Sequence, residues 1–247
     1  MLPQITDIVS SHEHLPDALT GLSETLAPNG GHSLLYGFYV HVHSASRNDF
    51  VMAHSHCDSL FAEADPETVF RASGGAATDI VAPNLPQITA PFPVDVRDVA
   101  EHLRAQNDTR LAWTLYYLDR GFQTVWIAPI NAPWAGGYGA LNHGLQARYA
   151  PPPLAEDGLI PLVHAFHDAV RKTGRLARHI GLTELELDTL QKFAQGRTTE
   201  EIAGLQKVSR QAVDQRMLRA RKKLRARNTI EAMYKAMVYG ALPWRPG

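Results

Sequence analysis

Apolar and polar positions predict several strands in the first 172 residues of the chain. The run 34–43, LLYGFYVHVH, is aromatic and β-branched, and residues 50–53 follow a turn-like segment as its partner strand. Two further strands are predicted at 122–130, where Pro129 ends the strand, and in the glycine-rich stretch 136–145. This pattern gives the first part of the chain a sheet.

Helical spacing of apolar residues predicts two helices among these strands. Leucines four and three residues apart predict a helix over 107–120, with Gly121 as the residue that ends it, and an apolar stripe predicts another over 159–172. Four prolines between residues 83 and 93 exclude a helix interior, so an irregular connection or a lid is expected there. Strands mixed with helices predict an α+β domain over 1–172.

Capping signals mark helix starts near the C-terminal end. Thr183 and Thr198 each stand three residues before a glutamate, which is the spacing of a capping box, and Ser209 can cap a third helix. The helix that starts at Thr199 is short, the third is long and basic, and an apolar stripe predicts a fourth over 228–242. A short helix, a tight turn and a long helix form a helix-turn-helix, in which the helix after the turn lies in the major groove of DNA.

Charge is divided unequally along the chain, although the formal net charge is only -1. Residues 182–247 carry 13 lysines and arginines against 7 acidic residues, or +6, so 1–181 carry 11 against 18, or -7. Eight of the basic residues lie between Ser209 and Arg227, with Asp214 as the one acid among them. A solvated helix face explains such a run in isolation. Beside the predicted helix-turn-helix, the run favours a polyanion-binding module attached to an acidic domain.

The segment 182–232, LTELELDTLQKFAQGRTTEEIAGLQKVSRQAVDQRMLRARKKLRARNTIEA, resembles the LuxR-type (GerE-like) DNA-binding domain of bacterial transcription regulators. Fifteen spaced positions match that family's pattern without a gap. They are Leu182, Thr183, Glu186, Leu190, Gly196, Glu201, Ile202, Ala203, Val208, Ser209, Val213, Lys223, Leu224, Asn228 and Ala232. The resemblance implies an all-α four-helix helix-turn-helix domain over 182–247, which a linker over 173–181 joins to the domain before it.

Two departures from the family's pattern fall in the turn, where this chain has Gln206 for leucine and Lys207 for glycine. We expect a turn that is more tightly packed or shifted by Leu205. The stretch 209–225 is also similar to the promoter-reading end of a sigma factor. The predicted fourth helix and the lack of an upstream segment that binds core polymerase favour the LuxR-type interpretation.

The resemblance implies which residues contact DNA. They are Thr198, Thr199, Ser209, Arg210, Gln211, Asp214, Gln215, Arg216, Arg219, Lys222 and Lys223. The arginines are expected to read guanine and the glutamines adenine, while the lysines and the N-terminus of the second helix hold phosphates. Asp214 has two interpretations of similar weight. In the first, it faces the duplex, where it accepts a hydrogen bond from a cytosine amino group or repels the backbone of non-target DNA. In the second, it forms a salt bridge with Arg210 or Arg221.

A LuxR-type module behind an α+β domain of about 170 residues resembles the quorum-sensing subclass. This implies that the N-terminal domain is an α/β/α sandwich that dimerises and binds an N-acyl homoserine lactone. Asp65 precedes a proline, like the aspartate that accepts the ligand's amide proton in that subclass, although a turn or helix cap explains it equally well. Met52 and His56 replace aromatic residues of the subclass, so the ligand is either an acyl homoserine lactone or another small molecule. The residues expected at the ligand are Tyr36, Phe38, Asp65, Trp113, Tyr117 and Trp126.

Histidines suggest an alternative role for the N-terminal domain. His41 and His43 alternate on a predicted strand and share a face, as do His54 and His56, with Cys57 adjacent. Four imidazoles can bind zinc, although their spacing fits no ligand motif and solvent-facing histidines explain them as well. A metal-sensing domain tethered to the DNA-binding module therefore remains an alternative, as does a ligand-independent regulator. No nucleophile elbow, phosphate-binding loop or zinc-protease helix occurs, so no enzyme activity is predicted.

Composition favours an ordinary globular protein of the cytoplasm. Apolar residues make up 45% and charged residues 20% of the chain. Apolar runs stay shorter than the roughly 18 to 20 residues of a membrane span, and the N-terminus lacks a signal segment. The single cysteine fits a reducing compartment. We predict a cytoplasmic homodimer whose partners are double-stranded DNA and a small autoinducer-like molecule, with no cofactor and no membrane contact.

Overall fold

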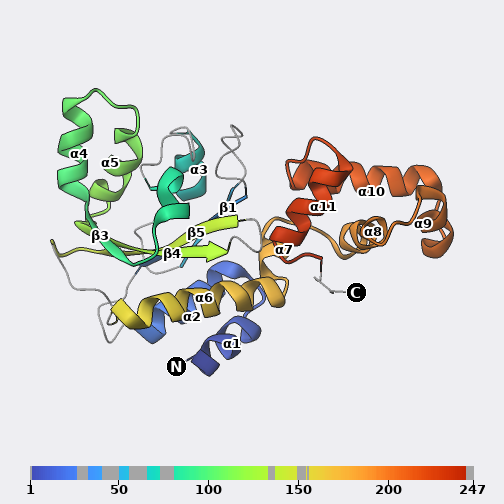
Figure 1. The fold of residues 1–247 in the computed structure, drawn as a ribbon, viewed down its shortest axis with the longest axis horizontal. Helices are drawn as coiled ribbons and strands as arrows, with labels where there is room; N and C mark the ends of the chain where they lie inside the picture. Colours follow the sequence, from blue (N-terminus) through green and yellow to red (C-terminus); the bar gives the residue numbers. More distant parts are fainter. Residues whose placement is uncertain are drawn as a thin grey trace. The chain divides into compact units, whose positions relative to one another are not determined.

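The chain folds into two compact units, Met1–Ala169 and Val170–Gly247 (Figure 1). The structure is a computed structural model. It describes residues 2–26, 33–40, 50–55, 66–72, 81–132, 137–148, 154 and 156–242. The first unit combines helices with a sheet, and the described residues of the second unit form helices and turns.

A five-stranded antiparallel sheet with the order β2-β1-β5-β4-β3 forms the middle layer of the first unit. Its strands are β1 (Ser33–Val40), β2 (Phe50–His54), β3 (Phe92–Asp95), β4 (Thr124–Ala132) and β5 (Gly137–Leu145). Helices lie over both faces (Figure 1), which confirms the predicted α/β/α sandwich. Every residue of β1 is buried, because this strand has neighbours on both sides and helices above and below.

The helices of the first unit form the two outer layers. One layer contains α1 (Leu2–Ser11), α2 (Leu15–Leu26) and α6 (Glu156–Lys172), with α1 packed on α2. The other contains α3 (Pro66–Ala72), the 3-10 helix η4 (Ala82–Gln87), α4 (Val96–Ala105) and α5 (Leu111–Asp119) (Figure 1). The sequence analysis predicted α5 and α6 but did not identify the others.

Two prolines behave differently from the sequence-based expectation. Pro129 does not end its strand, because β4 continues to Ala132. Strand β3 pairs with β4 only as far as Ile127, so among the described strands only β5 pairs with β4 at Pro129. Proline lacks an N–H and is tolerated where a strand has one free side. Pro93 lies in β3, which is an edge strand, so the proline-rich stretch is partly regular.

The second unit contains five helices in its described residues. They are α7 (Arg175–His179), α8 (Glu184–Ala194), α9 (Thr199–Gln206), α10 (Arg210–Lys223) and α11 (Thr229–Val238). Both predicted capping boxes are present, at Thr183 and Thr198, and the side chains of Ser209 and Asn228 cap α10 and α11. The segment predicted as a linker holds α7, whose Leu176 is buried.

The turn between α9 and α10 has the geometry expected of a helix-turn-helix. Lys207 adopts the left-handed conformation, with φ 53° and ψ 46°, which glycine adopts more easily. Leu205 is 61% exposed, so it does not pack into the turn or shift it, contrary to our expectation. A cluster of Ile202, Ala203 and Val213 holds the two helices together instead.

The length and polarity of a helix decide whether it can cross a membrane. Among the described residues, every helix is too short or too polar to cross a bilayer.

Candidate functional site

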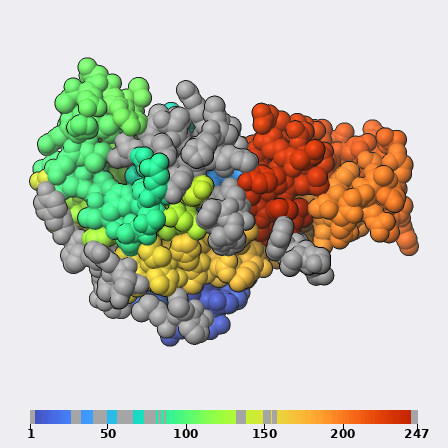
Figure 2. All heavy atoms as spheres, viewed as in Figure 1, coloured from blue at the N-terminus to red at the C-terminus, as the bar shows by residue number. Residues whose placement is uncertain are grey.

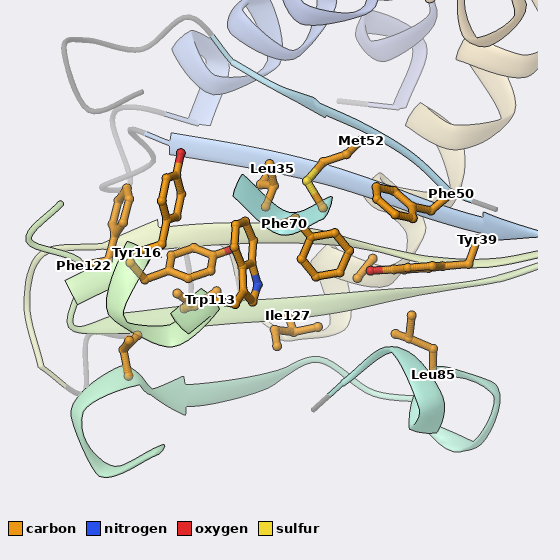
Figure 3. Packing of buried hydrophobic residues seen from close by; sticks show 14 residues of the cluster. Leu35, Tyr39, Phe50, Met52, Phe70, Leu85, Trp113, Tyr116, Phe122 and Ile127 are labelled. Carbon is orange, nitrogen blue, oxygen red and sulfur yellow. The ribbon is translucent and has the colours of Figure 1, made fainter. Parts of the chain in front are cut away.

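A cavity lies in the first unit between the sheet and the layer formed by η4, α4 and α5. It encloses about 690 Å³ of empty space, part of it open to solvent. Its lining residues are Leu35, Gly37, Tyr39, Met52, Val81, Leu85, Val94, Val96, Val99, Trp113, Thr114, Tyr117, Val125, Ile127, Ala140 and Asn142. Several of these side chains point toward one another from the strands and from α5 and η4 (Figure 3).

Strand register decides which side chains reach this cavity. On β1 the lining residues are Leu35, Gly37 and Tyr39, which alternate along the strand and therefore share a face. Their neighbours on β5 continue the same surface, since Leu35 is paired with Asn142 and Gly37 with Ala140. A Cβ atom added at Gly37 would lie 3.8 Å from the Tyr39 ring, an ordinary contact, so a larger side chain fits there only by entering the cavity.

Stacked aromatic rings form one wall of the cavity. The Trp113 ring stacks on Tyr116 with centroids 5.0 Å apart, and it meets the edge of Phe70 at 4.9 Å (Figure 3). Tyr117 packs edge-on against Trp113 at 5.1 Å. These contacts fix the indole against the sheet, because buried aromatic pairs prefer such offset and edge-to-face arrangements.

The cavity has few polar groups. Among the described residues, its lining includes no charged side chain, and hydrogen-bonding side chains are supplied by residues such as Thr114, Tyr117 and Asn142. The Oδ1 atom of Asn142 is buried and has no hydrogen-bond partner in the described part of the chain. An unsatisfied buried acceptor costs about 1–3 kcal/mol, which a donor on a bound molecule can recover. The cavity is therefore suited to a neutral, mostly apolar molecule with a hydrogen-bond donor.

Two of the six predicted ligand residues, Trp113 and Tyr117, line the cavity. Tyr36, Phe38 and Trp126 do not. They belong to the opposite face of the sheet, because they alternate with the cavity-lining positions of β1 and β4.

On that opposite face Tyr36 and Phe38 pack against α6. The Tyr36 Oη atom lies 2.8 Å from His167 Nδ1, and the Phe38 ring lies 4.5 Å from the His167 ring. Asp65 lies outside the described residues. Gly37 and Asn142 were missed: alternation from a correctly placed face of β1 would have indicated Gly37, while Asn142 lies on β5 and follows from the pairing of the two strands.

The histidine alternative is only partly open to inspection. His54 is described, with its Nδ1 atom 3.0 Å from the carbonyl of Ser55. His41, His43, His56 and Cys57 lie outside the described residues. Within the described ranges, no three metal-binding side chains of the His, Cys, Asp and Glu types come together.

The second unit presents helix α10 as a candidate nucleic-acid interface. Its Val213, Met217 and Ala220 are buried against the other helices, and the opposite side is exposed. The helices of this unit form a continuous surface of side chains, coloured orange to red in Figure 2. Gln211, Asp214, Gln215, Arg219 and Lys222 are the predicted DNA contacts of α10 that are exposed and have no ion pair or side-chain hydrogen bond among the described residues.

Three predicted contacts at helix starts have local structural roles. The Thr198 and Ser209 hydroxyls accept hydrogen bonds from the backbone of Glu201 and Ala212, so both residues cap helices. Thr199 is the first residue of α9 and is half-buried. Short side chains of this kind position the helix N-termini, which remain able to bind phosphate through the backbone.

Lys223 is held inside the second unit, contrary to the expectation that it binds phosphate. Its Nζ atom donates to Glu186 Oε2 at 2.8 Å and to the carbonyl of Gly181 at 2.7 Å. Burial raises the pKa of Glu186, but the hydrogen bonds from Lys223 and Thr183 outweigh burial and hold the pKa below its ordinary value. Lys223 therefore links α10 to α8 in this structure.

Arg216 is also engaged. Its Nη1 atom donates to Gln206 Oε1 at 2.6 Å, and Gln206 Nε2 donates to Asp188 Oδ2 at 2.6 Å. Asp188 forms an ion pair with Lys192 as well, and the hydrogen bond from Lys192 is the main cause of its lowered pKa. This network joins α8, α9 and α10 through the half-buried Arg216 side chain, so reading of guanine by Arg216 would require its bond to Gln206 to break.

The two interpretations of Asp214 can now be compared. Arg210 pairs with Glu200 at 2.6 Å, and Arg221 donates to the carbonyl of Arg227. Neither forms the proposed salt bridge with Asp214, which is exposed. This leaves the Asp214 carboxylate facing solvent on α10.

No protein-family model matches the chain, and no curated protein matches it by sequence. Among solved structures, its fold is similar to that of Escherichia coli SdiA, with a TM-score of 0.51, 14% sequence identity and coverage of 98% of each chain. SdiA in complex with octanoyl-rac-glycerol matches with a TM-score of 0.48 and 13% identity, over 99% of this chain and 91% of that one. The N-acylhomoserine lactone dependent LuxR family transcription factor CepR2 from Burkholderia cenocepacia matches with a TM-score of 0.46 and 17% identity. This match covers 71% of the present chain and 96% of the CepR2 chain. The first match confirms the predicted fold over the whole chain.

Proposed function

We propose that this protein is a cytoplasmic transcription regulator that responds to a small molecule and binds double-stranded DNA as a homodimer. In this proposal residues 1–172 bind the ligand and dimerise, and residues 182–247 bind DNA. The observation that carries it is the capped pair α9 and α10, joined by a tight turn, with an exposed polar face on α10. The proposed activity of the protein is the binding of a ligand and of DNA, not catalysis.

The dimensions and charge of α10 support the DNA-binding part. A helix of 14 residues is about 21 Å long, and an α-helix about 10–12 Å in diameter fits the roughly 12 Å width of the major groove. Arg219 and Lys222 are exposed on this helix, and residues 182–247 carry a formal charge of +6. Attraction between these charges and the phosphates supplies sequence-independent affinity that falls as salt rises.

The cavity supports the ligand-binding part. A neutral molecule with an apolar chain would fill the space between Trp113 and Ile127, and a donor such as an amide N–H would satisfy Asn142 Oδ1. An acyl homoserine lactone has both features, as do other acylated small molecules. Ligand burial would order the first unit and favour the dimer, and two linked DNA-binding modules then bind a two-part site more tightly than one.

Helix α11 offers a second dimer surface in this proposal, in addition to the one assigned to residues 1–172. Ile230 is 75% exposed and Met237 is 38% exposed. These residues are seven positions apart, so they share a face of the helix. A second copy of the chain would remove this apolar surface from water.

DNA binding is tested with the full chain and fluorescent duplexes selected from a randomised pool at low salt. We expect Lys222→Ala to weaken binding of every bound duplex and to reduce the slope of log affinity against log salt by about one. Arg178→Ala, which removes an equal charge from an exposed position on α7, serves as the control and should leave both unchanged. A folded protein that binds no duplex at low salt would refute the proposal.

Ligand binding is tested by mass spectrometry of small molecules that co-purify with the folded chain, followed by fluorescence titration. Dodecanoyl homoserine lactone is the first probe. If it enters the cavity, indole fluorescence should change in Trp126→Phe, whose missing ring lies on the opposite face of the sheet. The change should be much smaller in Trp113→Phe, which loses the ring that lines the cavity. Equal changes in the two variants would place the probe elsewhere.

A further inference from the structure

The exposed face of α10 has an ordered set of side chains. Its buried side is formed by Val213, Met217, Ala220 and Leu224. At about 100° per residue, the line opposite that side passes through Gln211, Gln215 and Lys222, and Leu218 lies about 50° to one side of it. Arg219 is exposed about 50° to the other side, and Asp214 is exposed about 90° from the line, beyond Leu218. The middle line is therefore the part of α10 that would reach deepest into a groove.

Guanidinium groups are absent from this middle line. Arg216 is turned toward α9, where it donates to Gln206 at 2.6 Å. Arg210 pairs with Glu200 at 2.6 Å, and helical spacing places it beyond the flank that holds Asp214. Arg219 lies on the other flank of the line, toward the side of α10 that carries Arg216. Only Lys222, in the last turn of the helix, puts a positive charge on the line itself.

The chemistry of Gln211, Gln215 and Leu218 favours A·T base pairs. A glutamine carboxamide pairs with the N6 and N7 atoms of adenine, and an apolar side chain contacts the methyl group of thymine. The bidentate contact to guanine is made by arginine or lysine. Gln211 and Gln215 supply two carboxamides, and Leu218, which is 39% exposed, supplies an apolar contact one turn further along.

The spacing of these side chains along α10 can be compared with the spacing of base pairs along the duplex. Four residues advance a helix by about 6 Å, and one base pair advances the duplex by about 3.4 Å. Gln211 and Gln215 therefore reach positions about two base pairs apart, with Leu218 close to the next. Asp214 sits beside the two glutamines, where its carboxylate can accept from an adenine or cytosine amino group and disfavours contact with phosphate.

We propose that α10 reads a run of A·T pairs in each half-site, with Gln211 and Gln215 each selecting an adenine and Leu218 a thymine. This inference rests on the proposed function and adds the class of operator that the surface selects. In it, Arg216 is a positioning residue that fixes α10 against α9 through Gln206.

The test is selection from a randomised duplex pool with the full chain, followed by sequencing of the bound fraction. The wild-type chain should enrich half-sites with two adenines about two base pairs apart. Gln215→Ala should reduce the preference for one of these adenines about tenfold and keep the other. Gln215→Arg should replace that adenine by guanine at the same position. Gln195→Ala, an exposed glutamine at the end of α8, is the matched control and should leave the selected sequences unchanged.

Three results would overturn the inference. A G·C-centred half-site that is the same in Gln215→Ala would show that other residues read the bases, while the proposed DNA binding would stand. A guanine preference that disappears in Arg216→Ala would show that Arg216 leaves Gln206 on binding and reads the bases. This result would also refute the inference and leave the proposed DNA binding in place. Failure to enrich any duplex would refute the DNA-binding proposal together with this inference.

Discussion

Replacing Glu231 by glutamine is expected to loosen the junction between α10 and α11 at neutral pH. The Glu231 Oε2 atom accepts from the backbone N–H and the Nε of Arg227, at 2.9 and 3.0 Å. Its Oε1 atom lies 3.1 Å from the Nζ of Lys235. Lys235 is fully buried, and its Nζ also donates to the carbonyl of Arg225 at 2.8 Å. The Glu231 carboxylate therefore balances a buried ammonium group, whose charge would otherwise be costly.

The pKa of Glu231 sets the size of this effect. Burial raises the pKa, but the hydrogen bonds from Arg227 and Lys235 outweigh it and lower the pKa from 4.5 to about 2. Such a difference corresponds to about 3 kcal/mol at neutral pH, and solvent near the 16% exposed side chain lowers the expected loss to about 1–3 kcal/mol. Because the folded state has the lower pKa, this stabilisation is present above pH 4.5 and is lost as the pH falls toward 2.

Urea denaturation of the full chain, followed by circular dichroism, measures the free energy of unfolding. The difference between the wild type and Glu231→Gln should fall to less than half between neutral pH and about pH 3, since the wild type has by then lost much of the carboxylate's contribution. Glu184→Gln, which changes an exposed glutamate at the start of α8, should change the free energy of unfolding by at most a few tenths of a kcal/mol at either pH. A loss in Glu231→Gln that is the same at both pH values would refute the linkage argument.

Three further substitutions test other parts of the molecule. Lys207→Gly should raise the free energy of unfolding by about 1 kcal/mol in urea denaturation, because glycine adopts the left-handed conformation at no steric cost, while Lys207→Ala should bring no such gain. Gly37→Leu should fill the cavity, so that the folded variant no longer retains a co-purifying small molecule in native mass spectrometry; full retention would contradict the assignment of the cavity. Arg216→Ala should lower the free energy of unfolding by about 1–3 kcal/mol without changing the salt dependence of DNA binding, because it breaks a bond to Gln206 rather than a phosphate contact.

The helices of the second unit were predictable because their signals are local. A capping box needs two side chains three residues apart, and both Thr183 and Thr198 form one as expected. Ser209 and Asn228 cap the next two helices through a bond to the backbone three residues on. Roles that depend on partners far along the chain were missed, as with Lys223, which binds a carbonyl 42 residues away.

The cavity was harder to predict, since helices cover both faces of the sheet. Strand β1 is buried at every position, and its sequence does not alternate between polar and apolar residues, so it does not distinguish one face from the other. Large aromatic residues favoured Tyr36 and Phe38 as ligand contacts, yet the pairing of Leu35 with Asn142 puts the other set of residues at the cavity. A register is a property of the whole sheet, and a single strand does not reveal it.

Some missed elements did have a signal in the sequence. Helix α2 buries Leu15, Leu19, Leu22 and Leu26, whose spacing of four, three and four residues is that of an amphipathic helix. Helix α4 begins after Asp95, whose side chain accepts from the backbone N–H of Asp98. The leucine spacing of α2 and the cap of α4 follow the same rules that identified the helices of the second unit. Both helices were therefore predictable from the sequence.

The turn of the helix-turn-helix shows how tertiary packing overrides a local preference. A lysine in the left-handed region costs about 1–2 kcal/mol relative to glycine, so Lys207 alone would favour a different turn. Ile202 and Val213 are fully buried on either side of the turn, with Phe193 and Val208 packed against them. Moving the turn would expose at least one large apolar side chain, which costs about 1.5–3 kcal/mol. The core therefore holds α10 in place despite the unfavourable lysine, and the exposed face that we propose reads DNA is fixed by residues that would not touch it.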